Sequence, residues 1–340
     1  MEKDESWLKY LITGAAGFIG SSISSFLRIA GNSVSGVDNF SEYYSKELKH
    51  QRVEKLLSPL GIKVLEADVS EYNLISKIVK SEKPDFVIHL AAQAGVRIPI
   101  NQNQKYVTSN LVGFSNVLQV VVENEVPNFI YASSSSVYGD SAKIPYSELE
   151  NNLKPKSFYG ATKLSNELLT PTLTYGSKTR SRGIRFFTVY GPWGRPDMAY
   201  FRLLSAALTG SKFHLFGDGG FERDFTYIDD VVSIVKKLCD DLKDMDPGFH
   251  DIVNLGGGRP LSMNYLIKEI EKITGKSIII QRHNENEGDS IKTMADPTYL
   301  ESILGKLQFT PLEHGINKFH AWCIESKNLN ELNNWVSSSK

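Results

Sequence analysis

Cysteine is scarce in this chain, with only Cys239 and Cys323 among 340 residues and neither of them in a Cys-x-x-Cys pattern. The scarcity argues against a disulfide framework, and we interpret both residues as small buried hydrophobic groups in a reducing compartment. The late histidines His314 and His320 have no partners at metal-ligand spacing. No metal site is therefore expected.

An excess of one charge and a long hydrophobic run are also missing. The chain has 38 Lys and Arg against 39 Asp and Glu, a formal net charge of −1 and no long basic run. Neither a nucleic acid nor a membrane surface is therefore expected as a partner. Residues 2–5 are all charged and the next apolar run is short, whereas a signal peptide or a membrane span needs a longer apolar stretch. We therefore expect a cytoplasmic protein.

The chain does have enough apolar residues for a large core. Its 340 residues, 41% of them hydrophobic and 23% charged, predict one large domain or two closely packed ones. In the first half, short apolar runs without internal alternation are separated by longer amphipathic stretches. Such runs are typical of strands buried on both faces, so we predict an α/β fold around a parallel sheet. The expected strands are 10–12, 34–37, 64–66, 86–90 and 129–132, and the expected helices are about 18–30, 45–57, 70–80, 104–124 and 158–174.

The rhythm loosens after about residue 190, where glycine and proline break the chain into shorter pieces. We therefore expect residues 1–190 to bind a cofactor at the carboxyl ends of the strands. Residues 191–340 are expected to form mostly a smaller substrate-binding lobe, with some segments returning to the first sheet.

Three glycines directly after the first expected strand, Gly14, Gly17 and Gly20, form a Gly-x-x-Gly-x-x-Gly pattern. Glycines permit a tight turn, close approach to a pyrophosphate and close packing of the following helix. The start of that helix offers unpaired N–H groups to an anion. A purely structural turn would also explain three glycines.

The second expected strand ends at Asp38, 18 residues after Gly20. A carboxylate there accepts hydrogen bonds from both ribose hydroxyls of NAD and repels a 2′-phosphate. Asn39 and Phe40 supply no arginine to offset that repulsion, so NAD is favoured over NADP. Asp68, at the end of the third run, is assigned to an adenine contact, and an exposed loop aspartate is the alternative.

Tyr159 and Lys163 stand four residues apart, on one face of an expected helix. A lysine ammonium near a phenol favours the phenolate and prepares the tyrosine as a general base. The serine run 133–136 follows the fifth expected strand, so its hydroxyls lie at the same sheet edge. An exposed Tyr-x-x-x-Lys pair is common by itself, but its order after the glycines, Asp38 and the serines favours an active site.

At this point the sequence resembles the extended short-chain dehydrogenase/reductase group of NAD-dependent sugar epimerases and dehydratases, over nearly the whole chain. Within that group it most resembles UDP-glucuronate 4-epimerases. The resemblance implies a Rossmann-type doubly wound sheet with a smaller α/β substrate lobe. The stretches that carry it are residues 37–40 (Val-Asp-Asn-Phe), 43–44 (Tyr-Tyr), 89–97 (His-Leu-Ala-Ala-Gln-Ala-Gly-Val-Arg), 133–139, 185–199 and 223–230.

The resemblance implies roles for individual residues. Tyr159 would take the proton from the sugar 4-hydroxyl, Lys163 would hold it and the nicotinamide ribose, and Ser134 would be the catalytic hydroxyl. Hydride would leave C4 for NAD and return to the opposite face after the 4-keto sugar rotates. The implied cofactor-binding residues are Gly14, Gly17, Phe18, Ile19, Gly20, Asp38, Asn39, Asp68, Val69, Leu90, Ala91, Ala92, Tyr159 and Lys163. The implied substrate-binding residues are Arg97, Ser134, Ser135, Ser136, Thr188, Arg195, Arg223 and Asp289.

Two positions in the serine run separate the sister reactions of this group. Dehydratases place an Asp-Glu pair where this chain has Ser135 and Ser136, and UDP-glucuronate decarboxylases carry a glutamate at the second position. Serines cannot act as carboxylate acid and base, which leaves re-reduction of the 4-ketone. A 4-keto glucuronate readily loses carbon dioxide, and the resemblance assigns the grip on its carboxylate to Thr188 and Arg195.

The leading prediction is reversible C4 epimerisation of UDP-glucuronate to UDP-galacturonate. The alternatives are a 4-epimerase for UDP-glucose or UDP-N-acetylglucosamine, a UDP-glucuronate decarboxylase, and a catalytically silent NAD-binding protein. By resemblance we also expect a homodimer that pairs helices 104–124 and 158–174 into a four-helix bundle. Two departures from the family pattern are Asn286-Glu287 before Gly-Asp and Pro171, which should end or kink its helix.

Overall fold

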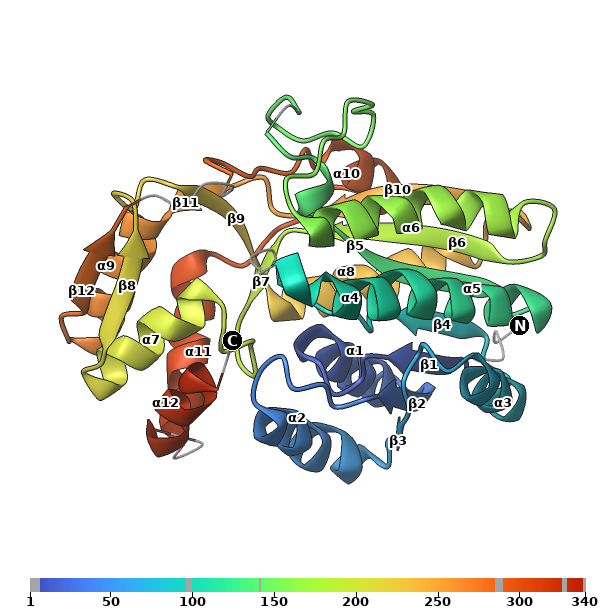
Figure 1. The fold of residues 1–340 in the computed structure, drawn as a ribbon, viewed down its shortest axis with the longest axis horizontal. Helices are drawn as coiled ribbons and strands as arrows, with labels where there is room; N and C mark the ends of the chain where they lie inside the picture. The colour runs from blue at the N-terminus through green and yellow to red at the C-terminus, as the bar shows by residue number, and fades with distance from the viewer. Residues whose placement is uncertain (1–6, 96–99, 141, 285–289, 326–328, 339–340) are drawn as a thin grey trace.

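A seven-stranded sheet forms the centre of the chain (Figure 1). The structure is a computed structural model that describes residues 7–95, 100–140, 142–284, 290–325 and 329–338. The strands pair in the order β10-β6-β5-β4-β1-β2-β3, and every pair is parallel. Their bounds are β1 Lys9–Thr13, β2 Ser33–Asp38, β3 Lys63–Glu66, β4 Phe86–His89, β5 Asn128–Ser134, β6 Arg180–Phe186 and β10 His250–Leu255. The predicted parallel α/β fold is confirmed.

Helices cover both faces of this sheet, which explains the apolar runs of its strands. Alternate residues enter two separate cores: Leu11 and Val87 pack on one side, and Ile12 and Ile88 pack on the other. A strand buried on both faces shows no polar alternation. Helices α3, α5 and α6 lie side by side on the first face, and α1 and α8 pack together on the second. The helices of this part are α1 Phe18–Ile29, α2 Lys46–Arg52, α3 Tyr72–Glu82, α4 Asn103–Tyr106, α5 Gly113–Glu123, α6 Phe158–Thr174 and α8 Ile228–Leu242.

A smaller lobe lies beyond the carboxyl ends of the strands, at the left of Figure 1. It contains a three-stranded sheet in the order β11-β9-β7 and a parallel pair of β12 and β8. Its strands are β7 Thr188–Tyr190, β8 Lys212–Phe216, β9 Glu222–Tyr227, β11 Pro260–Ser262 and β12 Ile279–His283. Its helices are α7 Ala199–Thr209, α9 Met263–Thr274, α11 Leu312–Glu325 and α12 Leu329–Ser337, while α10 Thr298–Leu304 contacts β10.

Two later segments return to the large sheet. Strand β10 pairs with β6 over its full length, and α8 packs against α1. The division of the chain near residue 190 stays a proposal. The expectation that Pro171 could end its helix is wrong, because α6 continues through it to Thr174. The missing N–H of proline removes one backbone hydrogen bond, and the helix ends three residues later.

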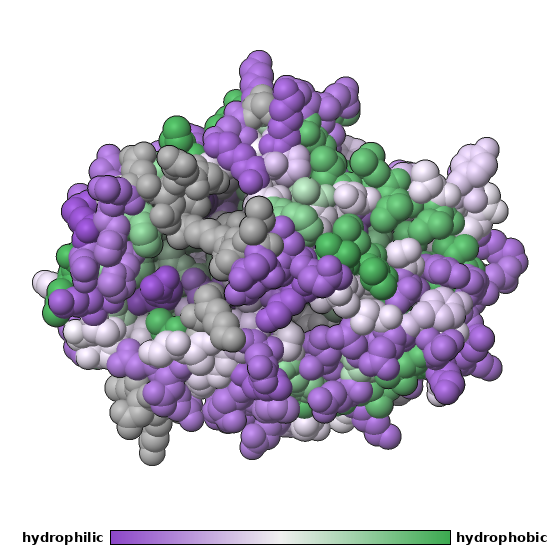
Figure 2. All heavy atoms as spheres, viewed as in Figure 1, coloured by the Kyte–Doolittle hydropathy of each residue, from purple (hydrophilic) through white to green (hydrophobic). Residues whose placement is uncertain are grey.

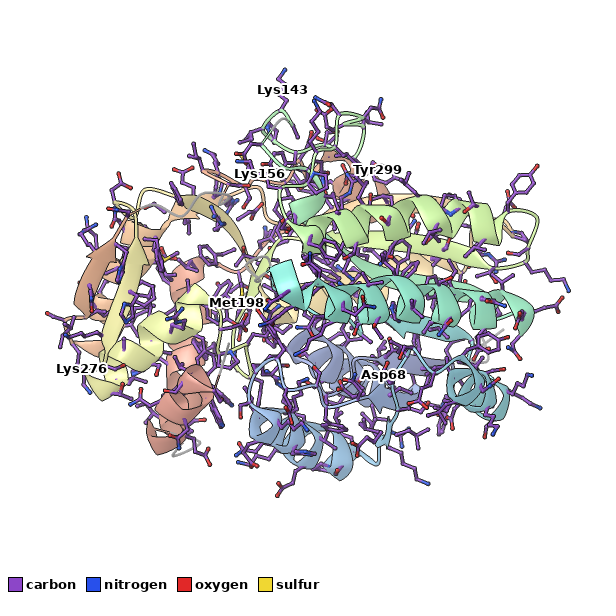
Figure 3. The ribbon with its side chains drawn as sticks, viewed as in Figure 1. Asp68, Lys143, Lys156, Met198, Lys276 and Tyr299 are labelled. Carbon is purple, nitrogen blue, oxygen red and sulfur yellow. The ribbon has the colours of Figure 1, made fainter. Side chains whose placement is uncertain are left out.

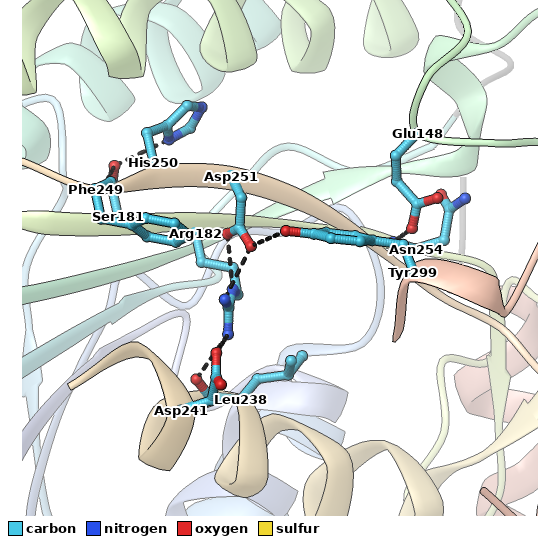
Figure 4. A network of polar contacts seen from close by, with 10 residues as sticks. All are labelled: Glu148, Ser181, Arg182, Leu238, Asp241, Phe249, His250, Asp251, Asn254 and Tyr299. Atoms are coloured by element: carbon cyan, nitrogen blue, oxygen red, sulfur yellow. Dashed lines mark hydrogen bonds and ion pairs between the residues drawn. The ribbon is translucent and has the colours of Figure 1, made fainter. Parts of the chain in front are cut away.

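A buried arginine fastens the returning segments to the sheet (Figure 4). Arg182 on β6 is 1% exposed and donates to both carboxylate oxygens of Asp251 on β10, at 2.7 and 2.9 Å. It also pairs with Asp241 on α8 at 2.9 Å, and the hydroxyl of Tyr299 on α10 donates to Asp251. One guanidinium therefore holds three elements that lie far apart in the sequence.

Membrane-spanning helices and metal-ligating clusters can be assessed only for the described residues. In that part of the chain, no helix combines the length and the apolar character that a membrane crossing requires. Within the same residues, no group of three His, Cys, Asp or Glu side chains gathers at a possible metal site. Both cysteines are buried and free, as their apolar surroundings in the sequence predict.

Candidate active site

A cavity of about 720 Å³ lies between the carboxyl ends of the large sheet and the smaller lobe. Its walls come from the turns after β1, β2, β4 and β5, from the start of α6, and from lobe segments around β7, β8 and β9. Met198 of the lobe and Lys156 before α6 line it, and Figure 3 shows Met198 between the lobe and the sheet. The cavity therefore lies at the carboxyl ends of the strands, where parallel sheets bind their ligands.

The glycine turn after β1 can exist only with glycine. Gly14 has φ +73°, and a Cβ atom added there would lie 2.7 Å from the backbone nitrogen of Ala91. A Cβ added to Gly20 would lie 2.0 Å from the carbonyl oxygen of Gly14. Gly17 caps α1 without a side-chain acceptor, so the first N–H groups of the helix face the cavity that Phe18 and Ile19 line. This cradle fits the pyrophosphate of a dinucleotide.

Asp38 ends β2 at the cavity wall with its carboxylate fixed by the backbone. One oxygen accepts from the N–H of Ala16 at 3.0 Å, and the other accepts from Phe40 at 2.8 Å. Each oxygen keeps a lone pair for a ribose hydroxyl. Asn39 lines the cavity beside it and donates to Asp68 at 2.7 Å.

The remaining expected cofactor residues divide into two groups. Asp68 itself is not among the lining residues, and its carboxylate is engaged by Asn39 and Ser70. The residues that do line the cavity are Val69, Leu90, Ala91, Ala92, Tyr159 and Lys163. At this corner the cavity is therefore lined by Val69 and not by the aspartate, and the adenine contact expected of Asp68 stays a prediction.

Sequence reasoning missed a lysine in the cofactor half of the cavity. Lys49 of α2 is 5% exposed and lines the cavity. Its ammonium donates to the carbonyl and the hydroxyl of Ser41, at 2.8 and 2.9 Å. Asn39 and Phe40, directly after Asp38, carry no charge, whereas the fold brings this cation to the cavity from eleven residues after Asp38.

The tyrosine, the lysine and the serine meet at one end of the cavity. Tyr159 and Lys163 lie one turn apart on α6, and the Lys163 nitrogen is 5.7 Å from the centre of the Tyr159 ring. Ser134 ends β5, and its hydroxyl hydrogen-bonds with Tyr159. The Lys163 ammonium donates to the carbonyl of Ala132 at 2.8 Å. The three expected catalytic side chains are thus brought together.

The electrostatics of this group differ from expectation. Burial raises the pKa of Tyr159 above its usual value, and the charge of Arg195 and the hydrogen bond from Ser134 oppose that rise. The expectation that Lys163 lowers the pKa of Tyr159 is not met in this structure. The Lys163 ammonium is turned to the Ala132 carbonyl, and the cation that acts on the phenol comes from the other side of the cavity.

A buried ion pair behind Lys163 was also missed. Glu167, one turn further along α6, binds Arg185 of β6 through two contacts of 2.9 and 2.7 Å. It also accepts a hydrogen bond from Ser133, which precedes the expected catalytic serine. Burial lowers the pKa of Lys163 to about 8, and the negative charge of Glu167 opposes that fall. The spacing of Lys163 and Glu167 was the only signal in the sequence.

His89, the last residue of β4, does not line the cavity and belongs to the packed interior. The side chain is 1% exposed, and burial lowers its pKa to about 3, so the ring is neutral. Its Nδ1 atom hydrogen-bonds with the hydroxyl of Thr13 at 2.8 Å. The ring packs between strands β1 and β4 and the helix above them.

Expected substrate residues from both parts of the chain line the same cavity. They are Ser134, Ser135, Ser136, Thr188, Arg195 and Arg223. Arg97, Asp289 and the departure at 286–287 lie outside the described residues. Among the described residues that line the cavity, Asp38 and Asp197 are the only carboxylates. No acidic side chain of the described chain therefore takes the place beside Ser136.

Asp197 occupies part of the arginine fork that was expected to hold the substrate. The Nε and Nη2 atoms of Arg195 donate to its two carboxylate oxygens at 3.1 and 2.6 Å. Arg195 also lies 5.8 Å from the centre of the Tyr43 ring, with which it hydrogen-bonds. A guanidinium has five N–H donors, so the pairing leaves donors for a second acceptor although Asp197 neutralises the charge of Arg195.

Comparisons with known proteins cover nearly the whole chain. The NAD dependent epimerase/dehydratase family matches residues 10–256. The probable UDP-glucuronate 4-epimerase of Rhizobium meliloti is 36% identical over 331 residues, covering 93% of this chain and 96% of the relative. The UDP-glucuronic acid 4-epimerase of Bacillus cereus, solved with UDP-glucuronic acid and NAD, is 32% identical with a TM-score of 0.82 over 94% of this chain and 100% of the other. The UDP-glucose 4-epimerase of Thermotoga maritima, solved with UDP-glucose, is 27% identical with a TM-score of 0.83 over 94% and 100%.

Proposed function

The chain belongs to the NAD-dependent epimerase/dehydratase family, and we propose that within it this enzyme interconverts UDP-glucuronate and UDP-galacturonate by inverting C4. The family and the relatives make it an NAD-dependent nucleotide-sugar 4-epimerase or dehydratase. The observation that carries the finer proposal is the position of Arg195, which lines the same cavity as Tyr159 and lowers the pKa of that phenol against the effect of burial.

The proposed chemistry assigns one step to each catalytic side chain. Tyr159 takes the proton of the sugar 4-hydroxyl and later gives it back, while Ser134 donates a hydrogen bond to the same oxygen. Bound NAD supplies the acceptor and the donor of the C4 hydride. Lys163, fixed by the Ala132 carbonyl, keeps a positive charge near the tyrosine and holds the ribose. Because the same proton and hydride that are removed are returned, the reaction runs in both directions.

The serine run supports epimerisation over elimination. Removal of the C5 proton needs a free carboxylate near C5, and the lining residues that the structure describes offer only Asp38 and Asp197. Asp38 is held by the glycine turn, and Asp197 is paired with Arg195. Ser135 and Ser136 replace the acidic pair of the dehydratases. The oxidised sugar is then left to be reduced again.

The arginine supports an acidic sugar. A planar carboxylate accepts well from a guanidinium, and Arg195 keeps donors beyond those that Asp197 uses. Thr188, which lines the same cavity, supplies a hydroxyl for the same carboxylate. Holding the carboxylate away from alignment with the C4 carbonyl prevents the loss of carbon dioxide.

The second candidate is a 4-epimerase of neutral UDP-hexoses. Asp197 already neutralises Arg195. An uncharged sugar can therefore bind without leaving the arginine charge unpaired. The structural likeness to the Thermotoga maritima UDP-glucose 4-epimerase also supports it. The two candidates differ in the relative turnover of acidic and neutral nucleotide sugars.

The proposal is tested by incubating the purified enzyme with UDP-glucuronate, without added NAD, and following the sugar signals by NMR. We expect UDP-galacturonate to accumulate until the two epimers reach equilibrium. A parallel reaction with UDP-glucose measures the neutral activity. A UDP-pentose product, or faster turnover of UDP-glucose than of UDP-glucuronate, would refute the proposed substrate.

The enzyme should lose activity as the pH rises through about 8. Burial lowers the pKa of Lys163 to about 8, so its ammonium is present below that pH and absent above it. The proposed mechanism needs the ammonium, and kcat should therefore fall on the alkaline side. Glu167→Gln removes the charge that opposes this fall in pKa and should move the alkaline limb of the kcat profile to lower pH. A limb that stays in place in that variant would contradict the assignment to Lys163.

We also propose a homodimer, as the sequence analysis expected. Phe158, Leu168 and Leu173 on α6 and Val112 before α5 are exposed, Leu168 by 66%. Figure 2 shows hydrophobic side chains gathered over this part of the surface. A second copy that covers this stripe would form a four-helix bundle with α5 and α6. Sedimentation should give twice the 38.0 kDa of one chain, and Leu168→Glu should give a monomer.

A further inference from the structure

Arg52, the last residue of α2, has all five of its N–H donors satisfied inside the protein. The side chain is 0% exposed. Its Nε donates to the carbonyl of Trp193 at 2.9 Å, and its Nη2 donates to Trp193 at 2.7 Å and to Gly194 at 3.0 Å. Its Nη1 donates to the carbonyl of Ala16 at 3.1 Å and to the Tyr44 hydroxyl at 2.7 Å. None of these acceptors is a carboxylate.

The acceptors belong to the two halves of the active site. Ala16 lies inside the glycine turn that cradles the cofactor, between Gly14 and Gly17. Trp193 and Gly194 directly precede Arg195, the proposed anchor of the sugar carboxylate. Arg52 itself is not among the residues that line the cavity. One buried guanidinium therefore joins the cofactor turn to the substrate loop from behind both.

The substrate loop needs such a support. Trp193 has φ +62°, the left-handed region that side chains other than glycine adopt at a cost. Its carbonyl accepts two of the five Arg52 hydrogen bonds, and its ring packs 5.0 Å from that of Trp322. A Cβ added to Gly194 would lie 2.0 Å from the Tyr200 hydroxyl. The loop has little freedom, and its position follows the cofactor turn through Arg52.

Arg52 differs from the two other buried arginines, Arg182 and Arg185 of the large sheet, each of which is paired with a carboxylate. Arg182 is neutralised by Asp241 and Asp251 and lies outside the cavity wall, and Arg185 is neutralised by Glu167. Among the described residues, the hydrogen bonds of the Arg52 guanidinium go to carbonyl oxygens and a phenol, an arrangement in which desolvation is poorly compensated. An apolar side chain could fill the same space but could not hold two loops in register. The absence of a paired carboxylate among the described acceptors of Arg52 indicates that this side chain serves to hold the two loops in position.

We propose that Arg52 is a positioning residue that couples the cofactor turn to the Arg195 loop and so determines the preference for an acidic sugar. The inference rests on the proposed function, because it takes Arg195 as the carboxylate anchor. Arg52 contacts neither that anchor nor the sugar. It fixes the backbone of Trp193 and Gly194, the two residues directly before Arg195. A displacement of about 1 Å of the Arg195 side chain costs on the order of 100-fold in rate.

The test compares Arg52→Met, Arg195→Ala and the double variant in steady-state kinetics with UDP-glucuronate and UDP-glucose, each with saturating NAD. Arg52→Met should lower kcat/KM for UDP-glucuronate about 100-fold and for UDP-glucose less than about tenfold. Adding Arg195→Ala to Arg52→Met should cost less than about threefold more, because the two residues act through one contact. Arg182→Met is the matched control. It should lower the urea midpoint while leaving the ratio of the two substrates unchanged.

Arg52→Lys keeps the charge but loses the planar fork, so it should show nearly the same loss of selectivity. If Arg52→Met does not fold, Arg52→Lys replaces it in the comparison of the two substrates. Equal losses for both sugars, additive effects of Arg52→Met and Arg195→Ala, or wild-type selectivity in Arg52→Lys would each overturn the proposal. If the wild-type enzyme prefers UDP-glucose, the proposed function fails. In that case the coupling between Arg52 and Arg195 is tested by whether Arg52→Met and Arg195→Ala have additive effects on kcat/KM for UDP-glucose. A failure of the proposed function and a failure of the coupling therefore give different results.

Discussion

Tyr159→Phe should lower kcat by about 10³-fold or more while NAD still binds. The phenol hydrogen-bonds with Ser134, and the centre of its ring lies 5.7 Å from the Lys163 ammonium nitrogen. Phenylalanine keeps the packing of the ring and removes the oxygen that exchanges a proton with the sugar. Turnover is measured by NMR as above, and NAD binding by the quenching of protein fluorescence.

Tyr106→Phe is the control for this substitution. Its ring lies 6.5 Å from that of Tyr159, and its hydroxyl donates to the carbonyls of Ala94 and Gly95. Losing that hydroxyl removes structural hydrogen bonds and should lower the melting temperature without a comparable loss in kcat. If Tyr159→Phe kept more than a tenth of the wild-type kcat, another group would have to be the proton carrier.

Arg195→Met should reverse the preference between acidic and neutral nucleotide sugars. Removing one partner of a buried charged contact costs about 2–5 kcal/mol, so kcat/KM for UDP-glucuronate should fall by about 10²-fold or more. The substitution also leaves Asp197 unpaired in the cavity, where it repels the substrate carboxylate. UDP-glucose carries no such charge and should lose less than about tenfold. Steady-state kinetics with both substrates measure the ratio.

The double variant Arg195→Met/Asp197→Asn separates the lost attraction from the new repulsion. With both charges removed, the cavity should turn over UDP-glucose at close to the wild-type rate and UDP-glucuronate poorly. The NMR spectra also report the fate of the 4-keto acid, since a carboxylate without its anchor is free to align with the carbonyl and leave as carbon dioxide. Unchanged UDP-glucuronate turnover in Arg195→Met would remove this residue from the site.

The local part of the architecture was predictable because it depends on short-range patterns. Apolar runs gave the strands around Leu11 and Val87, and the glycine spacing located a turn that only glycine can form. The Tyr159 and Lys163 pair, four residues apart, had to share a helix face. Each of these inferences needs only neighbouring residues and the period of a helix or a strand.

Most of the electrostatic contacts were not predictable, because they join residues that the sequence separates. Arg52 meets Trp193 across 141 residues, and Glu167 meets Arg185 from another element. The pairing of Arg195 with Asp197 involves near neighbours, but only the loop geometry shows that both side chains face the same cavity. The direction of the Lys163 ammonium likewise depends on which carbonyl the fold places within its reach.

The seventh strand of the large sheet reaches its place late in synthesis. Strand β10 is made of His250–Leu255 and covers the outer edge of β6. While the ribosome has delivered only the residues before β10, the polar backbone groups of β6 are open to pairing with any other extended segment. A fragment that ends near residue 190 lacks β10, so this edge of β6 stays unpaired, and the fragment should aggregate. Domain exchange between relatives is therefore best made at loops of the lobe that leave β10 and its Arg182 clasp intact.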